Sequence, residues 1–168
     1  NITSAMVAFG MQPVLPAFAG HVPKQMVTKY PSANITHLPP WHGHFPVGTY
    51  FLSPSSSAGG SSGGQGQQGQ GQGQDLFREI GEKFIQRQAS ALGVATWPGP
   101  HFYLADAYNE MAPPTTNATF LASVSRSMYD AMAAGDPQAL MVTQGWFLSG
   151  VPHLPWGADQ ARAFLHGP

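Results

Sequence analysis

Residues 101–114 have the sequence HFYLADAYNEMAPP, and this stretch decides the predicted fold. It begins as a mostly apolar run, which is typical of a strand buried in a parallel sheet. It then becomes polar at Asp106, Asn109 and Glu110, and two consecutive prolines prevent a helix from starting at once. A carboxylate and an amide therefore follow the end of a buried strand. Ligands and catalytic side chains lie at such positions in α/β proteins.

Two other segments show the same change from apolar to polar residues. The first leads through a turn of small residues to His21, and the second leads to Gln144 and Trp146. The three predicted strands cover residues 12–18, 101–107 and 139–145.

Apolar residues at three- and four-residue spacing predict helices that connect these strands. The clearest helix covers 75–92, with Asp75 as its N-cap and Gly93 as its stop, and a second covers 117–134. Shorter helices are predicted over 1–10, 22–30 and 158–165. Right-handed crossovers make the strands parallel neighbours whose carboxyl ends share one rim. We therefore predict an α/β fold that is part of a (β/α)₈ TIM barrel. Since a whole barrel takes about 250 residues, the chain supplies about three β/α units.

The remaining sequence divides the chain into three parts. Residues 1–54 are barrel with a long aromatic loop over 31–54, residues 55–74 are a flexible Gly/Gln/Ser insertion, and residues 75–168 are barrel again. The loop contains three histidines, His37, His42 and His44, but their spacing fits no structural zinc pattern and no cysteine or nearby carboxylate completes a site. We predict neither a metal nor an organic cofactor. The loop either borders a pocket or simply packs.

Composition excludes several classes of function. The net charge is -1 and only 9% of residues are charged, so no basic surface favours nucleic acid or anionic lipid. No apolar run approaches the roughly 20 residues of a membrane-spanning helix. The chain has no cysteine, so neither disulfides nor thiolate chemistry is open to it. Because it opens without Met or a signal peptide, we interpret it as a segment of a longer protein.

Three Asn-x-Thr sequons are present, at Asn1, Asn34 and Asn117. Such triplets mark glycosylation acceptors in secreted proteins, but they also occur by chance. Their number favours a secreted or lysosomal route, and chance remains the alternative.

Among the acidic residues, only Asp106 and Glu110 follow a predicted strand. The others are predicted to lie on solvated helix surfaces: Asp75, Glu79, Glu82, Asp130, Asp136 and Asp159. A partly desolvated carboxyl at a strand exit has a raised pKa and can donate a proton. Asp106 is either such a group or a turn-former. The amide of Asn109 beside Glu110 suits a glycosidase, which must hold a sugar substituent while it protonates the leaving oxygen.

Three parts of the sequence carry a specific resemblance. They are Asp106-x-x-Asn109-Glu110-Met111-x-Pro113-Pro114, the run GMQPVLPAFAGHVP at 10–23, and Gln144-Gly145-Trp146. Together they resemble the lysosomal-type α-N-acetylglucosaminidases, glycoside hydrolase family 89, over nearly the whole chain except the Gly/Gln insertion.

The resemblance implies a retaining exo-hydrolase that removes terminal α-linked N-acetylglucosamine and acts on heparan sulfate in animals, in a lysosomal or secreted setting. It implies that Glu110 is the general acid/base and Asn109 its neighbouring amide, that the three strands are strands three to five of the barrel, and that the nucleophile lies beyond Pro168. The rest of the same polypeptide is then needed to complete the barrel.

Three further residues are predicted to bind substrate because they lie on the predicted rim: His21, Gln144 and Trp146. Trp146 either stacks on a pyranose or caps the barrel end. The predicted partner is a carbohydrate with a terminal α-N-acetylglucosaminide. The alternatives from other classes are a carbohydrate-binding or structural fragment without chemistry, and a different hydrolase on a β/α scaffold.

Overall fold

A three-stranded parallel sheet forms the centre of the computed structural model, which describes residues 2–40, 48–54, 72–108, 111–148 and 156–167. The strands are β1 (Val14–Pro16), β5 (His101–Leu104) and β6 (Ala139–Val142), in the order β1-β5-β6. Their register pairs Pro16 with Leu104 and Leu104 with Val142, so the carboxyl ends are level. Each strand lies inside its predicted range and is shorter than predicted.

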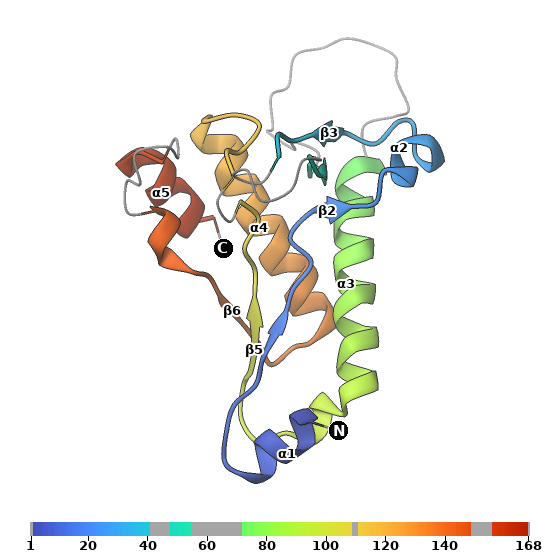
Figure 1. The fold of residues 1–168 in the computed structure, drawn as a ribbon, viewed down its shortest axis with the longest axis vertical. Helices are drawn as coiled ribbons and strands as arrows, with labels where there is room; N and C mark the ends of the chain where they lie inside the picture. The colour runs from blue at the N-terminus through green and yellow to red at the C-terminus, as the bar shows by residue number, and fades with distance from the viewer. Residues whose placement is uncertain (1, 41–47, 55–71, 109–110, 149–155, 168) are drawn as a thin grey trace.

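Two long helices cover one side of this sheet. They are α3 (Gln72–Leu92), which lies between β1 and β5 in the chain, and α4 (Ala118–Gly135), which connects β5 to β6. Figure 1 shows them running alongside the strands, as expected for crossover connections in β/α units. They pack closely because Gly81 faces Ala131, where an added Cβ would lie 2.7 Å from the Ala131 Cβ.

Shorter elements complete the described chain. They are α1 (Ile2–Ala8), α2 (Gln25–Lys29), α5 (Ala158–Leu165), and the 3₁₀ helices η1 (Val94–Thr96) and η2 (Gly145–Leu148). The helix α2 is shorter than the predicted helix over 22–30. The helix α3 begins at Gln72, three residues before the predicted start, and the side chain of Asp75 lies outside the described residues.

The predicted loop over 31–54 contains strands, so that prediction was wrong. Strands β3 (Ile35–His37) and β4 (Tyr50–Leu52) pair with β2 (His21–Val22) in a second, antiparallel sheet of order β2-β4-β3. In Figure 1 this small sheet lies beyond the carboxyl end of the central sheet. Phe51 and Leu52 are fully buried and join it to the main core. Residues 41–47, with His42 and His44, and residues 55–71 lie outside the described part of the chain.

The two faces of the central sheet differ. Leu15, His101, Tyr103 and Ala139 are buried beneath the helices. The other face is also apolar, yet Val14 is 52% and Leu140 46% exposed, and both pair with Phe102 in the register. The structure therefore has an apolar sheet face without a covering layer among the described residues.

Asp136 is buried, so its predicted place on a solvated surface was wrong. Only 7% of it is exposed, between the end of α4 and β6. Its Oδ2 accepts hydrogen bonds from Tyr103 Oη at 2.8 Å and from His101 Nδ1 at 2.6 Å, and its Oδ1 accepts one from the Gln138 amide at 3.0 Å. Burial alone would raise its pKa, but these donors and the His101 charge together hold the pKa below its usual value.

Other predicted surfaces match the structure in part. Glu79 pairs with Lys83, Asp130 with Arg126, and Asp159 is exposed near Arg162. Within the predicted apolar face of α3, Phe77 and Ile85 are buried, whereas Phe84 is 40% exposed.

Candidate active site at the carboxyl ends of the parallel strands

The predicted rim residues follow the three parallel strands. His21 follows β1 after a four-residue turn, and Gln144 and Trp146 follow β6. Asn109 and Glu110, predicted after β5, lie outside the described residues. The described structure therefore brings His21 to the β5 exit, and it shows the chain on both sides of the predicted acid.

His21 joins the β1 exit to the β5 exit. Its Nε2 lies 2.8 Å from the carbonyl oxygen of Ala107, 86 residues later in the chain. Its Nδ1 lies 3.3 Å from the hydroxyl oxygen of Thr49, next to β4. Burial lowers the His21 pKa more than the Ala107 hydrogen bond raises it, so the neutral imidazole is favoured.

An aromatic row lies beneath this rim, formed by His21, Phe51, Tyr108, Trp156 and Phe164. The His21 and Phe51 rings meet edge-on with centroids 5.6 Å apart, and Phe51 lies 5.2 Å from Tyr108. Trp156 then contacts Tyr108 at 6.2 Å and Phe164 of α5 at 5.5 Å. Such tilted and edge-on contacts are the favoured geometries of aromatic pairs. The row links the small sheet, the β5 exit and α5 into one packed layer.

Gly20 makes this row possible. Its φ is +95°, which favours glycine, and a Cβ at this position would lie 2.5 Å from Phe51 Cε2. The turn after β1 therefore passes directly against the Phe51 ring.

Asp106 lies at the β5 exit, and its carboxyl is partly desolvated. Its Oδ1 is buried and has no hydrogen-bond partner among the described residues. Burial raises the pKa of Asp106 to about 6, so the carboxyl is partly protonated in mild acid. The raised pKa fits the interpretation of Asp106 as a desolvated acid better than that of an exposed turn-former.

The chain is anchored on both sides of positions 109 and 110. Tyr108 is fully buried in the aromatic row and Met111 is 7% exposed in the same core. The Met111 amide donates to the Tyr108 carbonyl at 3.1 Å. Ala105, further back, donates to Val142 of β6 at 2.9 Å.

At the β6 exit, Gln144 and Trp146 form a pair. Trp146 Nε1 donates to Gln144 Oε1 at 2.9 Å, and 39% of Trp146 is exposed. An exposed indole beside an amide suits contact with a pyranose face.

Two of the three sequon asparagines are described, and both are exposed. Asn117 is the N-cap of α4, and its Oδ1 accepts from the Phe120 amide at 3.0 Å. Its Nδ2 makes no contribution to this bond. Asn34 precedes β3, and its carbonyl accepts from the Ser53 amide at 2.9 Å. Asn1 lies outside the described residues.

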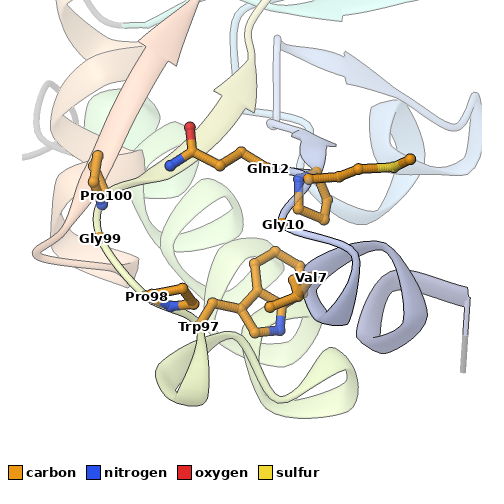
Figure 2. A pocket seen from close by; sticks show the side chains of 9 residues that line it. Val7, Gly10, Gln12, Trp97, Pro98, Gly99 and Pro100 are labelled. Carbon is orange, nitrogen blue, oxygen red and sulfur yellow. The ribbon is translucent and has the colours of Figure 1, made fainter.

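The opposite end of the sheet contains a pocket of about 310 Å³ (Figure 2). Its walls are the segment before β1 and the turn Trp97-Pro98-Gly99-Pro100 before β5. Figure 2 shows Gln12 as the polar side chain among mostly apolar neighbours. This pocket lies at the amino ends of the strands and is separate from the rim.

Within the described ranges, no three His, Asp or Glu side chains gather as a metal site, and no helix is long and apolar enough to cross a membrane.

Sequence reasoning missed Thr49 and Phe51 as parts of the rim, and it did not single out Tyr108 within the stretch 106–110 that was predicted to lie there. Thr49 and Phe51 belong to the strand pairing that was predicted as a loop. For Tyr108, the available signal was its position between Asp106 and Asn109.

The whole chain, residues 1–168, matches the family model of the alpha-N-acetylglucosaminidase TIM-barrel domain. Human alpha-N-acetylglucosaminidase is 34% identical over 168 residues, an alignment that covers 98% of this chain and 19% of the human protein. The chain therefore spans about a fifth of that relative's length.

Solved structures of family 89 glycoside hydrolases from Clostridium perfringens share the fold. One, in complex with 2-acetamido-1,2-dideoxynojirmycin, matches with a TM-score of 0.68 and 21% identity over 99% of this chain and 15% of its own. Another is a variant with two glutamates changed to glutamine, in complex with its substrate GlcNAc-alpha-1,4-galactose. It matches with a TM-score of 0.68 and 19% identity, over 98% of this chain and 16% of its own.

Proposed function

The chain belongs to the alpha-N-acetylglucosaminidase TIM-barrel family, and from this we propose that it forms part of the catalytic barrel of a retaining glycosidase that removes terminal α-linked N-acetylglucosamine. The observation that carries the proposal is the Asp106-x-x-Asn109-Glu110 motif directly after β5, at the sheet edge where the exits of β1 and β5 are joined through His21. The names of the relatives support the substrate class.

In the proposed mechanism, Glu110 is the general acid/base. Its carboxyl proton moves to the glycosidic oxygen as the bond from that oxygen to C1 breaks, so the leaving group departs as an alcohol. A second carboxylate, which we place outside this chain, forms the bond to C1. The Glu110 carboxylate then takes a proton from water, whose oxygen attacks C1 and frees both N-acetylglucosamine and the second carboxylate. That the bacterial substrate complex holds two glutamate-to-glutamine changes supports a chemistry with two carboxyls.

The rim around Glu110 supplies the remaining groups. We propose that Asn109 binds the substituent at the sugar carbon next to C1, and that Gln144 and Trp146 contact the sugar through the amide and the exposed indole face. The raised pKa of Asp106 provides a second partly protonated carboxyl near this site in mild acid.

The uncovered apolar face of the central sheet has a place in the same proposal. Val14, Phe102 and Leu140 lie on it at one level, as interior residues of a barrel do. We propose that other strands of the same polypeptide cover this face, that β1, β5 and β6 are strands three to five, and that the segments 1–54 and 75–168 belong to one barrel. A lysosomal or secreted location, glycosylation of the sequons and heparan sulfate as natural polymer stay predictions from the resemblance.

The test is Glu110→Gln in the complete polypeptide, assayed with an aryl α-N-acetylglucosaminide. Since general acid/base catalysis contributes about 100-fold or more, we expect a loss of at least that size with an unchanged unfolding transition. Glu79→Gln on the exposed side of α3 is the matched control and should retain full activity. Unchanged turnover by Glu110→Gln would contradict the proposal and favour a barrel that binds sugar without chemistry or uses other groups.

A further inference from the structure

We propose that His21 is a positioning residue that holds the exit of β5, and through it the acid that follows, without exchanging protons with the substrate. This inference rests on the proposed function of Glu110. It deepens that function because it gives the small antiparallel sheet a role in the reaction.

The hydrogen bonds fix the tautomer of His21. The Ala107 carbonyl can only accept, so Nε2 must carry the proton and donate it across 2.8 Å. In the neutral ring, Nδ1 is then an acceptor, and the Thr49 hydroxyl donates to it at 3.3 Å. Both ring nitrogens are engaged within the protein, and burial favours the neutral ring. A histidine in this state is poorly suited to shuttle a proton.

The surroundings of His21 hold the ring in place. His21 pairs with Phe51 in the β2–β4 register, and the Phe51 ring meets the imidazole edge-on. Phe51 in turn packs against both Gly20 and Tyr108. A ring confined by a strand partner and a packed aromatic neighbour has little freedom to rotate. It can therefore hold the Ala107 carbonyl at a fixed position.

The imidazole ring of His21 holds the backbone at the β5 exit. Pairing of β5 with its neighbours ends near Ala105, whose amide donates to Val142. Beyond that point, the chain before position 109 is held by the His21 bond to the Ala107 carbonyl, by the burial of Ala107 and Tyr108, and by the bond from the Met111 amide to the Tyr108 carbonyl. Among these contacts, the His21 bond is the one that a side chain from the β1 exit donates. Loss of the His21 donor should therefore move the segment that carries the acid, while the strand and its sheet remain.

A displaced general acid has a characteristic kinetic effect. A poor leaving group, such as a sugar, needs its oxygen protonated as it departs. A dinitrophenolate departs without that proton. Since kcat/KM reports only the steps up to the first bond cleavage, the two substrate types separate the position of the acid from sugar binding and from the nucleophile.

The experiment uses the complete polypeptide with His21→Leu, His21→Gln and His21→Asn. The Gln variant places an amide donor at a reach similar to that of Nε2, whereas Leu has no donor and the Asn donor is too short to reach. His37→Leu is the control, because His37 is an exposed histidine on the same small sheet that contacts Tyr50. Each variant is assayed with GlcNAc-alpha-1,4-galactose and with a dinitrophenyl α-N-acetylglucosaminide.

We expect His21→Leu and His21→Asn to lose roughly 100-fold in kcat/KM on the disaccharide and to stay close to the parent on the dinitrophenyl substrate. His21→Gln should recover most of the disaccharide activity, and His37→Leu should match the parent on both. If the Leu variant does not fold, the polar Asn variant provides the same comparison. Equal losses on both substrates, or none on either, would overturn the positioning role. Failure of the proposed function is distinct, because Glu110→Gln would then remain active.

Discussion

Asp136→Asn is predicted to lower the free energy of local opening at the junction between β5 and β6 by several kilocalories per mole. The parent carboxylate accepts three hydrogen bonds, two at Oδ2 and one at Oδ1. An asparagine presents one oxygen and one NH₂ group in the same space. If its oxygen takes the place of Oδ2, its NH₂ group meets the Gln138 amide, which is also a donor. In the other orientation its NH₂ group meets His101 Nδ1 and Tyr103 Oη, so the Tyr103 hydroxyl must turn to accept and the His101 proton must move to Nε2, which is buried with no hydrogen-bond partner among the described residues.

The size of the effect follows from these contacts. A buried donor left without its acceptor costs about 1–3 kcal/mol, and the other bonds lose the strengthening that a charged acceptor gives. Breaking a buried pair of this kind by changing one partner typically costs about 3–5 kcal/mol, and we expect this range. Tyr103→Phe removes one donor and leaves the carboxylate two others, so it should cost about 1.5–3 kcal/mol.

The pH dependence has a definite sign. Because the folded Asp136 pKa lies below its usual value, its stabilising contribution is present above the unfolded pKa of about 4 and is lost as the pH falls through the folded value. The difference in local opening free energy between parent and Asp136→Asn should therefore have its full size at pH 5 to 7 and become smaller below about pH 4.

Hydrogen exchange measured by mass spectrometry in the complete polypeptide is the suitable assay. It reports local opening free energies for peptides covering 101–104 and 139–142 without requiring a two-state transition of the whole molecule. Asp130→Asn is the control, because that exposed acid pairs with Arg126 on the same helix, and its substitution should cost at most about 1 kcal/mol. Unchanged protection of β5 and β6 in Asp136→Asn would refute the reasoning from the three donors.

Three further predictions concern the rim and its surroundings. Gly20→Ala should destabilise the fold by about 2–4 kcal/mol, since Ala is strained at φ +95° and its Cβ would displace the Phe51 ring; a normal unfolding transition would contradict this. Asp106→Asn should be more stable than the parent at pH 7 and equally stable near pH 4. The reason is that a folded pKa of about 6 makes the parent lose stability as the pH rises from about 4 through 6. Parallel curves of stability against pH for parent and variant would show that Asp106 is not desolvated. In secreted protein, Thr119→Ala should abolish a glycan at Asn117 and keep the cap of α4, whereas Asn117→Ala should also cost about 1 kcal/mol of stability. Peptide mapping that finds parent and Thr119→Ala differing only by the mass of the Thr-to-Ala substitution would show that this sequon is unused.

The sequence predicted the central sheet well because its signals are local. The apolar runs that end in polar residues located all three parallel strands, and the helical spacing located α3 and α4. The strands came out shorter because pairing depends on neighbours, and the register ends at Pro16, Leu104 and Val142.

The parts that sequence reasoning missed depend on contacts between distant residues. Strands β2, β3 and β4 have two or three residues each, too few for a periodic pattern, and they form through pairing with one another. Asp136 follows a helix and precedes a proline, as a solvated turn residue does, while its partner His101 lies 35 residues earlier. Likewise, nothing local to His21 indicates that its partner is the carbonyl of Ala107. Its place on the rim was predictable, but its state and its partner were not.

Azide rescue of Glu110→Ala in the complete polypeptide tests the proposed role of Glu110 as acid/base most directly. With a dinitrophenyl α-N-acetylglucosaminide, the variant should form the covalent intermediate and then stall, because no base activates water. Azide needs no base and fits the space left by the carboxyl, so it should restore turnover and yield the α-glycosyl azide. A β-glycosyl azide would make Glu110 the nucleophile, and a variant with full activity and no response to azide would remove Glu110 from the chemistry; either result would contradict the account.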